Sequence, residues 1–97
     1  MKKIFTLVYH LDNSMGDDKT MLVKAFATRE LAENGLCEFV KDLKTNDTLL
    51  KEIFNNSTTP ILPYEEYHED NNHFTFIDSN YDVIYEVYIE EVLFINE

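Results

Sequence analysis

The sequence predicts an α+β fold: a single two-layer domain, with a mostly antiparallel sheet of about four strands and two helices on one face of it. Three observations predict this class. Runs of β-branched and aromatic residues lie near both ends of the chain. A stretch with helical spacing of apolar residues lies between them. Gly and Pro number only two each among 97 residues, which favours long regular elements. The expected order is β-β-α-α-β-β, as in two-layer α+β domains.

The first two elements are predicted strands. Residues 3–11 are apolar on both alternating faces, which is typical of a central strand. Residues 12–19 form a polar loop with Gly16 as its flexible point, and residues 20–27 form the second strand.

The third element is a predicted helix over residues 29–44. Thr28 is suited to cap its N-terminus, because a Thr side chain accepts a hydrogen bond from the first turn. Gly35 lies inside the helix, where it costs about 1 kcal/mol relative to Ala, so we expect close packing against the sheet there. The apolar face recurs at helical spacing and comprises Ala32, Leu36, Phe39 and Leu43.

A second, shorter helix is predicted over residues 47–55, with Asn46 or Asp47 as its cap. Residues 57–72 are predicted to form an acidic loop, because Pro60 and Pro63 block helix there.

The last part of the chain is a predicted hairpin. Residues 73–78 and 81–89 alternate apolar and polar side chains and are separated by a turn signal. The apolar tail, residues 92–95, either extends the last strand or forms a short separate one. The predicted shared core comprises Phe5, Leu7, Leu36, Phe39, Ile53, Val87 and Ile89.

One segment resembles a recurring element of small uncharacterised bacterial and phage proteins. Residues 26–33 read Phe-Ala-Thr-Arg-Glu-Leu-Ala-Glu, similar to a phrase F-S-T-R-E-x-A-E that ends a strand and opens a helix. The strand before it often begins with K-I-F-x-L, as residues 3–7 do here. The resemblance covers roughly residues 3–43. It implies the strand-to-helix connection and a mobile-element origin, and it carries no activity over to this chain.

Charge is divided unequally along the chain. All eight Lys and Arg lie in residues 1–51 together with eight acids, whereas residues 52–97 hold eleven acids and no Lys or Arg. The net charge of −11 therefore resides in the second half. Such a chain is repelled by nucleic acid and by anionic lipid. With one Cys, no internal disulfide and no apolar run of membrane-spanning length, we expect a cytoplasmic protein without direct contact to nucleic acid or membrane.

Candidate chemical sites are weak. Two Gly cannot build a phosphate-binding loop, and a calcium loop over Asp12, Ser14, Asp17 and Asp18 fails because Gly and Glu are missing at its required positions. His68, Glu69, Asp70 and His73 could ligate a metal but share no helical face. Cys37 is expected to be a small buried hydrophobe, and His10 a core or edge residue. The sequence therefore predicts no enzyme, no cofactor and no metal.

The remaining pattern interleaves tyrosines with acids in the second half. Tyrosine is enriched at protein interfaces, and regularly spaced carboxylates on a strand can imitate a phosphate backbone. The predicted contact residues are Tyr64, Glu65, Glu66, Tyr67, Glu69, Asp70, Asp82, Glu86, Tyr88 and Glu90.

Two functions stay open. The first is a protein-binding module for a basic partner, such as a phage or mobile-element inhibitor that imitates DNA toward a nucleic-acid-binding protein. The second is a structural or self-associating subunit, for instance a homodimer, whose acidic face only solubilises it. Salt dependence of partner capture separates them, because acidic docking weakens steeply above ~0.15 M salt.

Overall fold

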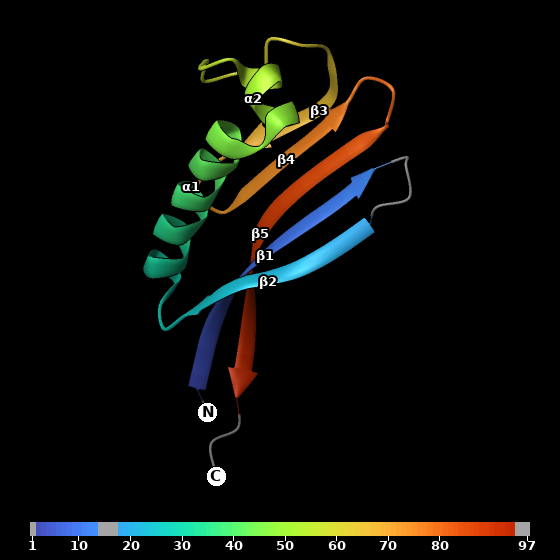
Figure 1. The fold of residues 1–97 in the computed structure, drawn as a ribbon. Coiled ribbons are helices and arrows are strands. Elements are labelled where there is room, and N and C mark those ends of the chain that lie inside the picture. Colours follow the sequence, from blue (N-terminus) through green and yellow to red (C-terminus); the bar gives the residue numbers. More distant parts are fainter. Residues whose placement is uncertain (1, 14–17, 95–97) are drawn as a thin grey trace.

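A computed structural model describes residues 2–13 and 18–94 of the chain. The elements are β1 (Lys2–Asn13), β2 (Asp18–Phe26), α1 (Arg29–Asn46), α2 (Thr48–Phe54), β3 (Tyr64–Glu69), β4 (His73–Asp78) and β5 (Val83–Phe94). Figure 1 shows a twisted sheet with α1 and α2 packed on one side of it. The predicted α+β class with an antiparallel sheet is confirmed.

The sheet has the strand order β2-β1-β5-β4-β3, and neighbouring strands are antiparallel. The first and last strands lie together at its centre. They pair along their whole length, from Lys2 opposite Phe94 to Asn13 opposite Val83. The edges are β2 and β3. The described part of the chain thus forms five strands rather than the predicted four.

The additional strand is β3, which lies within the predicted loop 57–72. Its sequence, Tyr-Glu-Glu-Tyr-His-Glu, is too polar to read as a strand. An edge strand pairs on one side only, and charged side chains there oppose unwanted pairing with other chains. Loop was therefore the wrong prediction for Tyr64–Glu69, although residues 57–63 and 70–72 do lie outside helices and strands.

The other boundaries shift little. Strand β4 matches its prediction, and the helices begin and end within two residues of theirs. Residues 92–94 extend β5 and do not form a separate strand, which decides between the two predictions for the apolar tail. Ile95 and Gly16 lie outside the described residues.

Both helices carry the predicted type of cap. The Thr28 Oγ1 atom accepts a 3.2 Å hydrogen bond from the Leu31 N–H. The Asp47 Oδ1 atom accepts bonds of 3.1 Å from the N–H groups of Leu49 and Leu50. These caps satisfy backbone donors that have no partner within their own helix.

The core lies between the helices and the sheet. Among the predicted core residues, Leu7, Leu36, Ile53 and Val87 are buried in one cluster. Phe5 is buried next to it, whereas Phe39 and Ile89 are only partly buried. The fully buried aromatic residues are Phe54, Phe74 and Phe76.

Close packing explains Gly35. A Cβ atom added at Gly35 would lie 2.4 Å from Cζ of Phe26 on β2. Real Cβ atoms essentially never come that close, so a side chain at position 35 would force the Phe26 ring or the helix to shift.

Candidate functional site

Strand alternation divides the sheet into two unlike faces. Leu7 and Tyr9 of β1 point toward the helices and belong to the core. Thr6, Val8 and His10 therefore point to the opposite side. No helix among the described residues covers that side (Figure 1). We call it the open face, and it carries the residues of each strand that alternate with the core residues.

A row of polar side chains crosses the open face from one edge of the sheet to the other. Its members are directly opposite one another in register: His68 of β3 faces Thr75 of β4, Thr75 faces Glu86 of β5, Glu86 faces His10 of β1, and His10 faces Thr20 of β2. Directly opposite side chains on one face are close enough to interact. The row is thus one continuous polar surface made by all five strands.

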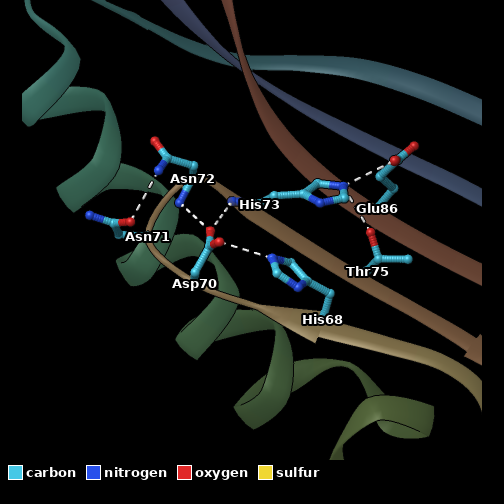
Figure 2. A network of polar contacts seen from close by, with 7 residues as sticks. All are labelled: His68, Asp70, Asn71, Asn72, His73, Thr75 and Glu86. Atoms are coloured by element: carbon cyan, nitrogen blue, oxygen red, sulfur yellow. Dashed lines mark hydrogen bonds and ion pairs between the residues drawn. The ribbon is translucent and has the colours of Figure 1, made fainter.

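Each histidine in this region lies beside a carboxylate. The His73 Nε2 atom is 3.1 Å from Glu86 Oε2 and 2.8 Å from Thr75 Oγ1. The His68 Nε2 atom is 2.9 Å from Asp70 Oδ2. Figure 2 shows both pairs, and the His68 and His73 rings are 5.6 Å apart.

His10 forms the third pair on the other half of the sheet. Its Nε2 atom is 3.8 Å from Asp18 Oδ1, and its Nδ1 atom is 2.8 Å from Thr20 Oγ1. The prediction that His10 is a core or edge residue is therefore too narrow, because its half-buried ring lies in a polar row on the open face.

Carboxylates dominate the charge of the open face. Among the residues that the structure describes, register and alternation place six acids on it: Asp12, Asp18, Glu66, Asp70, Glu86 and Glu90. Of the eight Lys and Arg, all of which lie in the described part of the chain, only Lys2 falls on this face, at its far end. Apolar side chains lie between the acids, among them Val8, Ile77, Ile84 and Tyr88. The open face therefore combines negative charge with apolar area.

Half of the predicted contact residues lie together on the open face: Glu66, Asp70, Glu86, Tyr88 and Glu90. Glu66 and Glu90 are exposed, while Glu86 and Tyr88 are half-buried. Asp70 also holds the β3–β4 turn, since its Oδ1 atom accepts bonds from the N–H groups of Asn72 at 2.7 Å and His73 at 2.9 Å. The Asn72 bond, and next the contact with His68, keep the pKa of the Asp70 carboxyl below its ordinary value.

Two predicted contact residues, Tyr67 and Glu69, lie on the helix side of the sheet instead. The Lys44 ammonium group donates to both carboxylate oxygens of Glu69, at 2.6 and 2.8 Å. The Tyr67 hydroxyl donates to Glu69 at 2.7 Å. Lys44 also lies 4.4 Å from the centre of the Phe54 ring. Burial first, and then the bond to Glu69, raise the pKa of Tyr67. These side chains join α1 to β3 within the molecule.

The other three predicted residues lie at the end of the molecule where β3 begins and β4 turns into β5. Tyr64 packs its ring against Tyr67 and Phe76 on the helix side. Glu65 contacts Tyr81, whose pKa it raises by accepting a hydrogen bond. Asp82 is exposed in the turn, where its N–H donates to Asp78 at 2.7 Å. The predicted set is thus split among two faces and one end.

Sequence patterns alone do not bring Asp12, Asp18 and the three histidines together on one surface. Alternation along each strand places them on the correct side once the register is known. That register depends on pairing between the two ends of the chain, which a local pattern does not contain.

Other regions offer less chemistry. A groove of about 450 Å³ between α1 and β2 is lined by apolar side chains together with four polar ones, Lys24, Asn34, Glu38 and Asp42. Cys37 is exposed on α1 rather than buried as expected. Among the described residues, no group of three or more His, Cys, Asp or Glu is arranged to hold a metal ion. Neither described helix combines the length and hydropathy that crossing a membrane requires.

Comparison with known protein families, with curated proteins and with solved structures found no match. The resemblance of residues 3–43 to small bacterial and phage proteins therefore stays a prediction.

Proposed function

We propose that this chain is a small acidic protein-binding module of the cytoplasm that docks a basic partner on the open face of its sheet. One observation carries the proposal: within residues 2–13 and 18–94, six acids and one Lys share a partly apolar sheet face that no helix covers. Like charges on one face destabilise a sheet modestly. A complementary positive surface would offset that repulsion and speed association.

The repetition of acids along and across the open face favours a partner that binds nucleic acid. Carboxylates recur along β5 at Glu86 and Glu90 and across the sheet at Asp12 and Glu66. A phosphate backbone likewise offers repeated negative charge without base-specific groups. An inhibitor that occupies a DNA-binding site is therefore the specific form of the proposal.

Charge reversal tests the surface. Glu66→Lys with Glu90→Lys changes two exposed open-face acids and moves the net charge from −11 to −7. Glu86 is left intact because it contacts His73. We expect the affinity for a ten-residue oligolysine peptide to fall roughly tenfold in 0.05 M salt, because two exposed carboxylate–lysine pairs are lost and two repulsive charges are added. Isothermal titration calorimetry measures the affinity, and NMR amide shifts map the bound surface.

The matched control reverses two exposed acids on the helix side, Glu38→Lys with Glu52→Lys, and gives the same net charge. Its affinity should fall by less than about threefold, because distant surface charges are largely screened. Equal losses in both variants would show that net charge alone attracts the peptide, and the proposed surface would be abandoned.

The alternative, a self-associating subunit, is favoured by edge strand β2. Met21 is 43% exposed and Leu22 is 62% exposed on it, and an unpaired edge can pair with a second chain. A bulge at Val23 and two Lys oppose such pairing. Sedimentation equilibrium decides: a dimer that Leu22→Lys abolishes would support this alternative, and a monomer at 0.5 mM would exclude it.

A further inference from the structure

We propose that the open face is a pH-gated binding surface, on which protonation of three histidines neutralises the carboxylates that hold a basic partner. The inference rests on the proposed function and adds its regulation. Its structural basis is the position of the histidines. The chain has three, and all three lie on this one face of the sheet, each within 4.0 Å of a different carboxylate.

His73 has the most crowded surroundings. Glu86 and Thr75 contact its Nε2 atom, Tyr88 lies opposite it on β5, and the His68 ring lies next to it. Glu86, which contacts His73, is also directly opposite His10 in the sheet, although the carboxylate that His10 contacts is Asp18.

His68 and His10 face charged groups of their own. Asp70 contacts His68, and Glu66 lies two residues earlier on the same strand and face. Asp18 contacts His10, and Asp12 lies opposite Asp18. The titratable groups that face the histidines are thus almost all carboxylates. A protonated imidazole would therefore form an ion pair with the carboxylate beside it.

Protonation changes the charge that a partner meets. With neutral histidines the described residues of the face include six acids (−6) and Lys2 (+1), a formal charge of −5. With three histidinium ions this becomes −2, while the net charge of the whole chain moves from −11 to −8. In addition, Asp18, Asp70 and Glu86 become engaged within the molecule. The partner would lose both attraction and contact atoms.

The pH range separates this effect from other titrations. Histidine is the side chain that ordinarily changes charge between about pH 5 and 8. Ordinary Asp and Glu carboxyls remain largely ionised at about pH 5.5, and lysine remains charged throughout. A ten-residue oligolysine peptide with an acetylated N-terminus, which removes the titrating α-amino group, is therefore a probe that keeps its charge between pH 7.5 and pH 5.5.

The experiment compares the affinity of three proteins for that peptide at both pH values in 0.05 M salt, with circular dichroism to verify the fold. The first is the wild type. Its affinity should fall roughly tenfold at pH 5.5, because three carboxylates would then pair with histidinium ions instead of with lysines of the peptide. The second carries His10→Gln, His68→Gln and His73→Gln. It should bind with similar affinity at both pH values.

The third protein keeps the three Gln substitutions and adds three histidines on exposed helix positions, by Asn34→His, Thr45→His and Thr48→His. It has the wild-type histidine count and overall charge, and its affinity should change less than threefold. A wild-type loss that the Gln variant shares, or that the relocated variant reproduces, would overturn the pH gate while leaving the binding surface intact. Absence of wild-type binding at pH 7.5 would overturn both proposals.

Discussion

Asp47 joins three parts of the molecule through one carboxylate. Its Oδ1 atom accepts the two capping bonds of α2 and a 2.9 Å bond from the hydroxyl of Tyr85 on β5. Its backbone N–H donates to Leu43 in α1 at 2.8 Å. A charged acceptor strengthens such bonds. The residue therefore fixes the junction of the helices over the sheet, a role that its sequence position as a helix cap only partly predicts.

The two tyrosines near Asp47 make the fold sensitive to alkali. Burial, and next the charge of Asp47, raise the pKa of Tyr9 to about 12. Burial, and next the hydrogen bond to Asp47, raise the pKa of Tyr85 as well. Their neutral forms are favoured in the folded state. The resulting stability is complete below about pH 10, where unfolded tyrosine is neutral, and is lost as the pH rises through the folded pKa.

We expect the free energy of unfolding, measured with urea, to fall between pH 10 and pH 12. In Tyr85→Phe it should be lower by about 1 kcal/mol at pH 7, because the bond to Asp47 is lost. The decline above pH 10 should be shallower in this variant. An unchanged slope would show that other groups control the alkaline transition.

At the scale of elements, α1 and β2 meet through Gly35 and Phe26. Replacing Gly35 by Ala should raise helix propensity by about 1 kcal/mol. In the wild type the added methyl group meets the Phe26 ring, and overpacking of this kind costs typically 1–3 kcal/mol. The substitution should therefore destabilise by up to ~2 kcal/mol.

In a Phe26→Leu background the same Gly35→Ala change should stabilise by up to ~1 kcal/mol, because the contact is gone. Urea unfolding of the four proteins gives the coupling between the two sites. Equal effects in both backgrounds would mean that α1 does not lie against Phe26.

Local patterns were sufficient for the buried elements and insufficient for the edge and the surface. The helix over Arg29–Asn46 follows from apolar residues at helical spacing and from the Thr cap. Strand β4 follows from its alternation of apolar and polar residues. Strand β3 does not, because its sequence is polar and its pairing with β4, where Tyr67 is opposite Phe76 and Glu69 opposite Phe74, is a tertiary contact that a local pattern does not contain. For the candidate site, alternation along β5 places Glu86, Tyr88 and Glu90 on one face. The opposition of Glu86 and His10 depends on long-range pairing.

At the scale of the whole molecule, the net charge of −11 opposes the compact state through self-repulsion. Added salt should screen this repulsion. We expect Tm to rise by several degrees, on the order of 4–8 °C per kcal/mol for a domain of this size, when NaCl increases from 0.02 to 0.5 M.

Calorimetry measures the shift, and Glu38→Lys with Glu52→Lys serves for comparison. Its net charge is −7 instead of −11, so salt should raise its Tm by less. A Tm that falls with salt in the wild type would show that attractive ion pairs, such as Lys44 with Glu69, outweigh the repulsion.

The central position of β1 and β5 has a consequence for how the chain acquires its structure. Strand β1 is synthesised before its partner strand, Val83–Phe94. At roughly 5–20 residues per second, the delay between the two strands is several seconds. Until then one edge of β1 has unpaired backbone N–H and C=O groups, and such an edge can pair with another chain. The apolar side chains of Phe5, Leu7 and Tyr9 lie on the adjoining face of the strand. Pairing of distant segments is also slow. The nascent protein therefore passes through a stage in which its future centre is its most aggregation-prone part.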